Sequence, residues 1–147
     1  MHVKIFKSSP DLPTPTYKHD GDAGFDICSN EDIVIPGGAV VLVDTGIRIS
    51  VPYGYEAQIR LRSSYAKKGV FIPNAPGTID YGYKGPVMVA MGNMKQHQGF
   101  HLSRGERFAQ IVINELPQVK LDIVGKDEFF EEDTDRGEAG FGSTGKW

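Results

Sequence analysis

Short runs of alternating apolar and polar residues dominate the chain, and glycine, proline and asparagine separate them. The alternation is clearest in residues 55–61, whose odd positions are apolar and whose even positions are polar. Further β-rich segments are expected at 3–6, 24–28, 32–35, 40–43, 47–51, 87–91, 107–113 and 119–124. Many short strands divided by turn residues predict an all-β sandwich or barrel.

Two segments depart from this simple pattern. Residues 87–91 are apolar on both faces, which indicates burial on two sides, either inside the domain or against another subunit. Residues 63–68 are the only stretch with helical character, and a serine there is placed to cap the helix. The sequence therefore predicts one short helix in an otherwise β protein.

The composition fits one globular domain of 147 residues, with 39% apolar and 24% charged residues. No apolar run reaches the length of a membrane span, and the first residues lack the apolar core of a signal peptide, so a cytoplasmic protein is expected. A net charge of −3 argues against a nucleic-acid partner. The only cysteine, Cys28, lies in an apolar segment, which favours a buried thiol, and the four histidines lack zinc-ligand spacing.

The last twelve residues, 136–147, form a glycine-rich segment with cationic and hydroxyl side chains. A GxGxxG pattern covers 140–145, but Trp147 ends the sequence and leaves no room for the helix that follows a phosphate-binding loop. Two interpretations remain open: a mobile solubilising tail, or an arm that closes over a nucleoside triphosphate. Residues 127–135 contain six acidic residues in nine, and a solvated linker is favoured there over a metal site.

Three other segments carry candidate chemistry. Loop 74–85 is dense in turn formers and holds Asp80, a carboxylate that can deprotonate a water molecule or simply hydrogen-bond its own turn. Residues 60–64 bring arginine and serine to the start of the expected helix, which suits phosphate binding or ordinary capping. Asp22 and Asp26 lie near a strand start, and one carboxylate suffices for a magnesium ion held mainly by nucleotide phosphates.

Taken together and in order, five segments resemble the motifs of the trimeric deoxyuridine triphosphatase (dUTPase) family. They are DAGFDICS at 22–29, RSSYAKKG at 62–69, NAPGTIDYGYKG at 74–85, RGERFAQIVI at 104–113 and RGEAGFGSTG at 136–145. The resemblance implies a jelly-roll-like β-barrel over 1–126, an acidic linker over 127–135 and a flexible C-terminal arm over 136–147 that closes over the active site. It also implies a homotrimer whose active sites are shared between subunits.

The implied reaction is the Mg²⁺-assisted hydrolysis of dUTP to dUMP and pyrophosphate by attack of water on the α-phosphorus. Such a reaction limits uracil incorporation into DNA and supplies dUMP for dTMP synthesis. By the resemblance, Asp80 activates the water, Tyr83 packs beneath deoxyribose where a 2′-hydroxyl would clash, and Asp26 reaches Mg²⁺ through water. The other residues matched to substrate contacts are Arg62, Ser63, Ser64 and Gln110 for phosphates, Asn74, Gly77 and Ile79 for uracil, and Arg136, Phe141, Gly142, Ser143 and Thr144 in the arm.

The sequence departs from the family at two positions. Gly82 stands where many members have an acid, and Ala139 stands where many have a glycine. Gly82 is expected to alter the loop slightly and Ala139 to restrict one dihedral angle of the arm. Neither change removes a catalytic group.

Two alternatives to dUTP hydrolysis follow from the same resemblance. In the related dCTP deaminases a catalytic glutamate lies in the strand that follows the segment matching loop 74–85. The best-matching position here is Ala90, which disfavours deamination. A non-catalytic regulator that binds dUTP and presents the closed arm to a protein partner is the second alternative. The presence of Asp80, Arg136 and Phe141 argues against a purely binding role.

Overall fold

The computed structural model describes residues 1–131, 134 and 137. The chain divides into two units, Met1–Pro117 and Gln118–Trp147. All the strands described lie in the first unit, and the described residues of the second include one short helix. The first unit therefore holds the scaffold on which a site can be built.

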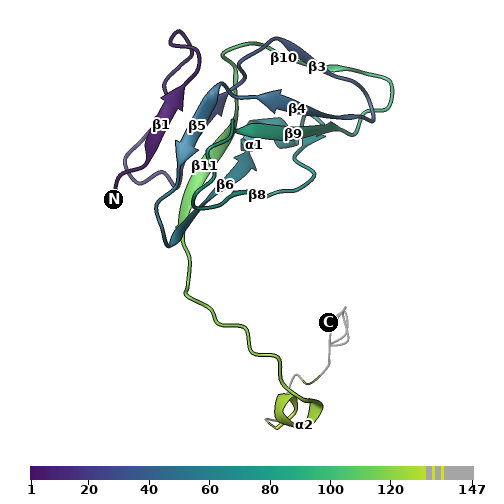
Figure 1. Cartoon of the computed structure of the whole chain (residues 1–147). Helices are drawn as coiled ribbons and strands as arrows, with labels where there is room; N and C mark the ends of the chain where they lie inside the picture. The colour runs from purple at the N-terminus through teal and green to yellow at the C-terminus, as the bar shows by residue number, and fades with distance from the viewer. Residues whose placement is uncertain (132–133, 135–136, 138–147) are drawn as a thin grey trace. The chain divides into compact units, whose positions relative to one another are not determined.

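In the part of the chain that the structure describes, eleven strands form four antiparallel sheets (Figure 1). The largest sheet has the order β2-β11-β6-β8, a second has the order β4-β9-β7, and β1-β5 and β10-β3 are two-stranded. This arrangement is a jelly-roll-like β fold, as the sequence predicts. The bounds are β1 (Lys4–Lys7), β2 (Gly24–Cys28), β3 (Ile33–Ile35), β4 (Val40–Asp44), β5 (Ile47–Ser50), β6 (Tyr55–Leu61), β7 (Val70–Phe71), β8 (Gly77–Ile79), β9 (Met88–Asn93), β10 (Phe100–Leu102) and β11 (Arg107–Glu115).

The core is built from the inward-facing residues of all four sheets. Phe108 and Ile111 of β11 pack with residues such as Ile35, Ile49 and Met91 from the other sheets, and each of these five is at most 2% exposed. Burial of this apolar surface is the main force that holds the sheets together. The outward-facing residues of β2, β11 and β6 are thus free to carry polar chemistry.

The strand expected at 87–91 is buried mainly on one face of the isolated chain. Val87, Val89 and Met91 are buried, whereas Met88 is 37% exposed. The alternation places Met88 on the outer face of the β4-β9-β7 sheet. Burial inside the domain therefore accounts for the face that carries Val87, Val89 and Met91. The face that carries Met88 is exposed in the isolated chain.

The prediction of a strand at 119–124 is wrong. This segment has no strand assignment, and Val119, Leu121 and Ile123 are 68%, 90% and 102% exposed. Alternation gives a segment the propensity for a strand, but the backbone also needs a partner for its N–H and C=O groups. No strand pairs with this segment in the described part of the chain.

The helix prediction needs three corrections. Helix α1 covers only Ser63–Ala66, and its N-cap residue is Arg62, which makes no side-chain capping bond. The chain leaves the helical conformation before Gly69, whose φ of +83° ends the turn. A second helix, α2 at Lys126–Phe129, lies where the sequence suggests only an acidic linker, and the three short strands β7, β8 and β10 were not predicted either.

Cys28 is a free, buried cysteine, as predicted. In residues 1–131, 134 and 137, no helix is long and apolar enough to cross a membrane.

Candidate active site

Asp26 lies at the centre of the candidate phosphate side of the site. In β2, Phe25 and Ile27 point into the core, so the alternation turns Asp26 to the opposite face. Strand pairing places Asp26 opposite Gln110 of β11, and Gln110 opposite Arg60 of β6. Residues far apart in sequence therefore meet in one row across the largest sheet.

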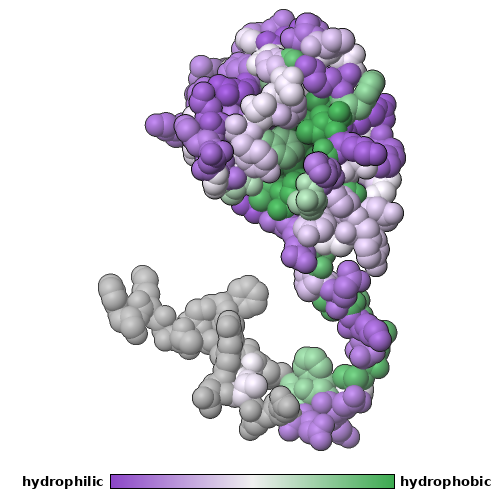
Figure 2. Space-filling view, turned by 90° about the vertical axis from the view of Figure 1, so that its left-hand side faces the viewer, coloured by the Kyte–Doolittle hydropathy of each residue, from purple (hydrophilic) through white to green (hydrophobic). Residues whose placement is uncertain are grey.

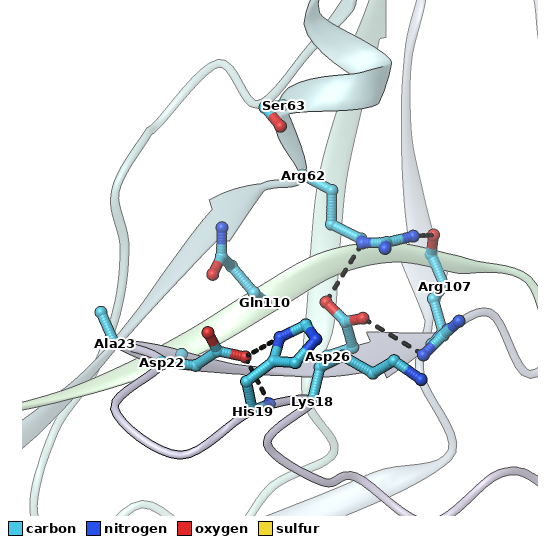
Figure 3. Close-up of a pocket in the computed structure, with 10 residues that line it drawn as sticks. Lys18, His19, Asp22, Ala23, Asp26, Arg62, Ser63, Arg107 and Gln110 are labelled. Atoms are coloured by element: carbon cyan, nitrogen blue, oxygen red, sulfur yellow. Dashed lines mark hydrogen bonds and ion pairs between the residues drawn. The ribbon is translucent and has the colours of Figure 1, made fainter.

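Two arginines contact the Asp26 carboxylate, one at each oxygen (Figure 3). The Nε atom of Arg62 lies 3.1 Å from Oδ1 of Asp26, and the Nη1 atom of Arg107 lies 3.5 Å from Oδ2. Arg62 also donates a hydrogen bond of 3.0 Å from Nη1 to the backbone carbonyl of Arg107. The side chain of Asp26 is only 19% exposed, which strengthens these charge-assisted contacts relative to ones at an open surface.

A cleft of about 300 Å³ opens beside this cluster. It has three cationic and two acidic lining side chains, so Arg62 and Arg107 are only partly neutralised by Asp26. An anion that enters would meet guanidinium groups whose positions are already fixed. The lining residues are Lys18, His19, Asp22, Ala23, Gly24, Asp26, Arg62, Ser63, Arg107 and Gln110.

This cleft brings together four of the predicted residues: Asp26, Arg62, Ser63 and Gln110. Ser64 is exposed in the same short helix but does not line the cleft. Arg107 was not predicted as a site residue, although its motif was recognised. A shift in the β2-β11 pairing between Arg107 and Ala109 helps to place it beside Asp26, and no local sequence pattern reveals such a shift.

The predicted nucleoside side forms a separate cavity of about 160 Å³. Strand β8 ends at Ile79, and the following loop carries the exposed residues Asp80 and Tyr83 to the cavity wall. Three predicted residues therefore meet here, and the cavity shares no lining residue with the cleft around Asp26. The full lining is Thr78, Ile79, Asp80, Tyr83, Pro86, Val87 and Met88.

The loop from Asp80 to Pro86 folds back on itself. The backbone N–H of Tyr83 donates to the carbonyl of Asp80 over 3.3 Å, and the Tyr83 hydroxyl donates to the carbonyl of Pro86 over 2.9 Å. Gly82 has φ of +87°, so a side chain there would be strained. A Cβ atom at Gly85 would overlap the ring of Tyr83, so the bare glycine backbone is the surface against which that ring lies.

The remaining predicted residues have mixed positions. Gly77 is buried in β8 opposite Ile59, whereas Asn74 is exposed in the preceding turn and lines neither cavity. The predicted arm residues Arg136, Phe141, Gly142, Ser143 and Thr144 lie outside the described residues.

A partly buried polar contact connects helix α1 to the chain before β11. The hydroxyl of Tyr65 donates a hydrogen bond to Oε1 of Glu106, and the backbone N–H of Ser103 donates to Oε2 over 3.0 Å. Burial and the Glu106 contact raise the pKa of Tyr65. Burial alone would raise the pKa of Glu106, but the hydrogen bonds from Tyr65 and Ser103, together with the charges of Lys68 and His101, outweigh it and lower that pKa.

Together, the fold and the cleft define a jelly-roll-like β protein with a cleft on its largest sheet that is lined by more cationic than acidic side chains. A family model described as dUTPase matches residues 11–145, and the chain belongs to the dUTPase family.

Curated relatives and solved structures agree with this assignment. The chain is 43% identical over 146 residues to the deoxyuridine 5′-triphosphate nucleotidohydrolase of Thermobifida fusca, covering 99% of this chain and 79% of that protein. It is 42% identical to the enzyme of the same name from Nautilia profundicola, covering 99% and 100%. The dUTPase of Staphylococcus bacteriophage 80alpha, solved with dUPNHPP, superposes with a TM-score of 0.88 at 27% identity and 99% coverage of both chains.

Proposed function

We propose that this protein hydrolyses dUTP to dUMP and pyrophosphate. The observation that carries the proposal is the Asp26 cluster, in which Arg62 and Arg107 present fixed cationic groups to a cleft on a β sheet. Phosphoryl transfer depends mainly on positioning and charge neutralisation, and such a cluster supplies both. Membership of the dUTPase family and the names of the relatives support the choice of dUTP as substrate.

In the proposed reaction, Asp80 accepts a proton from water as the water oxygen bonds to the α-phosphorus. The bond from that phosphorus to the oxygen bridging toward the β-phosphorus breaks, and pyrophosphate leaves. Asp80 suits this role because its carboxylate is exposed beside a cavity, where a water molecule can reach it. The supporting residues are Arg62, Ser63, Ser64 and Gln110 for the phosphates and Asn74, Gly77, Ile79 and Tyr83 for the nucleoside.

The described residues suit a magnesium ion that arrives with the substrate. Among them, no three histidine, cysteine, aspartate or glutamate side chains gather into a metal cage. Asp26 is a single carboxylate whose oxygens already face Arg62 and Arg107, which fits contact with Mg²⁺ through water rather than direct ligation. When bound, Mg²⁺ would neutralise charge on the phosphates.

We further propose a homotrimer with active sites shared between subunits. Asp80 and Tyr83 line a different cavity from Asp26 and Arg62. One substrate can contact all four residues if one subunit supplies the first pair and a neighbouring subunit supplies the second. The outer face of the β4-β9-β7 sheet is also apolar. Its exposed side chains are Val40, Leu42, Phe71 and Met88.

The side of the first unit that carries β1 also has an exposed apolar area, which favours association. Figure 2 looks onto the side of the first unit that carries β1 in Figure 1, and it shows an apolar area bordered by hydrophilic residues. On β1 itself, Phe6 is 60% exposed. Exposed apolar patches of this kind mark interaction surfaces more often than free surface.

The glycine-rich arm completes the proposal. Arg136 would contact the γ-phosphate, Phe141 would stack on uracil, and Gly142, Ser143 and Thr144 would complete the phosphate cradle. Closure of such an arm would exclude water and strengthen the charged contacts. A cytoplasmic location, where free deoxynucleotides are used, fits this activity.

The test is incubation of the protein and Mg²⁺ with dUTP, dCTP, dTTP and UTP in separate reactions. Products are separated by ion-exchange chromatography while pyrophosphate and ammonia are assayed. dUMP and pyrophosphate from dUTP, with UTP spared, are expected. Ammonia from dCTP would instead indicate a deaminase, although Ala90 offers no acid for that reaction, and binding of dUTP without turnover would indicate a regulator.

A further inference from the structure

The loop that carries Asp80 and Tyr83 has few internal contacts to set its direction. Its internal hydrogen bonds join Tyr83 to Asp80 and Tyr83 to Pro86, and it contains Gly82 and Gly85. Glycine adds conformational freedom to a loop, so these bonds fix its shape better than its orientation on the barrel. Its orientation must depend on contacts with other segments.

Those contacts come from one short stretch of chain. Arg48 donates a hydrogen bond of 2.6 Å from Nη1 to the backbone carbonyl of Lys84, and Lys84 donates one of 2.7 Å from Nζ to the hydroxyl of Ser50. The rings of Tyr53 and Tyr81 pack edge to face with centroids 5.4 Å apart. Strand β5 and the turn after it therefore hold the loop at two of its residues, Tyr81 and Lys84.

Strand β5 is a rigid support for these contacts. Ile47 and Ile49 are buried on either side of Arg48, and residues 47 to 50 pair in register with β1. The backbone of Arg48 cannot move without disturbing the core. Its guanidinium is a cationic donor, so the bond to the Lys84 carbonyl is charge-assisted.

We propose that Arg48 is a positioning residue for the nucleoside side of the site. Through the carbonyl of Lys84 it fixes the direction of the loop, and so the placement of the neighbouring Tyr83 ring and of the Asp80 carboxylate. This inference rests on the proposed roles of Asp80 and Tyr83 in dUTP hydrolysis. Misplacement of a reacting group by about 1 Å can cost about a hundredfold in rate, so a contact outside the cavity can influence turnover.

The test compares Arg48→Ala and Arg48→Lys with Lys4→Ala. Lys4 is an exposed cation that lines the same small surface hollow as Arg48 and Lys84, and its side chain makes no hydrogen bond or ion pair with the described residues. For each variant, kcat and KM are measured with dUTP and with UTP, and the oligomeric state is checked by light scattering. Hydrogen–deuterium exchange of residues 80–86 is measured without nucleotide.

The expected result for Arg48→Ala is a loss of about tenfold in kcat/KM for dUTP, the effect of one lost charge-assisted hydrogen bond. We also expect a smaller ratio of kcat/KM for dUTP to kcat/KM for UTP. Hydrogen–deuterium exchange of residues 80–86 should become faster. Arg48→Lys recovers part of each effect because it keeps a cationic donor, whereas Lys4→Ala resembles the parent protein. If Arg48→Ala does not fold, Ser50→Ala removes the other hydrogen-bonded contact with a smaller change, and its loop exchange should also accelerate.

Unchanged loop exchange and unchanged dUTP preference in a folded Arg48→Ala protein would overturn the proposal, as would equal losses in Lys4→Ala. Failure of the dUTPase assignment has a different signature. In that case the parent protein does not cleave dUTP, while the exchange measurement still reports whether Arg48 holds the loop.

Discussion

The hydroxyl of Tyr65 donates a hydrogen bond to the carboxylate of Glu106, and this bond joins helix α1 to the turn before β11. Arg62 directly precedes this helix and Arg107 directly follows Glu106 in sequence, so the bond joins the two chain segments that carry the arginines contacting Asp26. Lys68 adds a cation–π contact, with its Nζ atom 4.2 Å from the centre of the Tyr65 ring. Neither Tyr65 nor Glu106 lines the cleft itself.

This contact predicts a pH dependence of stability. The folded protein lowers the pKa of Glu106 below its ordinary value of 4.5, so the carboxylate stabilises the fold above that pH and the contribution is lost as pH falls through the folded pKa. The folded protein raises the pKa of Tyr65 above 10.0, so that contribution is present below pH 10 and is lost as pH rises further. Urea unfolding from about pH 3 to about pH 11 should show both losses.

Tyr65→Phe is the matched variant for that experiment. It keeps the buried ring but removes the donor, and we expect a loss of about 1 kcal/mol in the free energy of unfolding at neutral pH. The decline above pH 10 should disappear, and the acid decline should weaken because Glu106 keeps only the bond from Ser103. A variant whose alkaline decline matches that of the parent would show that Tyr65 is not the group responsible.

The strands that sequence predicts best are those with long alternation between clear turns. Both ends of β2 and of β6 agree with the expected residues 24–28 and 55–61. Strands β7, β8 and β10 have only two or three residues, so they show little alternation, although β3 is equally short and lies within the expected segment 32–35. Residues 119–124 show the opposite failure, because their alternation is good but a strand also requires a partner.

In the candidate site, too, the sequence predicts the residues that lie in local motifs but not those whose position depends on strand pairing. Asp26, Arg62, Ser63 and Gln110 were expected to act together because of the family motifs, and one cleft does contain them. Arg107 was missed because its approach to Asp26 depends on strand pairing and a register shift. The Arg48 contact was missed for a similar reason, since 36 residues separate it from Lys84.

Gly85 is predicted to be required for the position of the Tyr83 ring. A Cβ atom at this residue overlaps the ring, so Gly85→Ala should displace it and break the hydrogen bond to Pro86. We expect kcat/KM for dUTP to fall by about tenfold or more and UTP to be excluded less well. Gly125→Ala is the control, because a Cβ atom there meets open space. Unaltered selectivity in Gly85→Ala would show that the ring does not set the choice of sugar.

Deletion of residues 136–147 tests the proposed arm. The core of the first unit ends before Gln118, so the truncated protein should keep its thermal stability. Turnover of dUTP should fall by at least about a hundredfold, because arm closure supplies a cation and excludes water around the phosphates. The measurements are kcat/KM and the thermal unfolding midpoint. If the truncated protein keeps the kcat/KM of the parent protein, residues 136–147 are a solubilising tail and not an arm that closes over the substrate.

Asp80→Asn separates chemistry from binding. The amide has nearly the same shape as the carboxylate but cannot accept a proton from water, so kcat should fall by about a hundredfold to ten-thousandfold. Binding of a non-hydrolysable dUTP analogue should change little, because the proposed phosphate contacts lie in the other cavity, around Arg62. Calorimetric titration alongside steady-state kinetics measures both quantities. Equal losses of affinity and turnover would mean that Asp80 shapes the loop instead of activating water, whereas retained binding with lost turnover assigns it to the proton transfer.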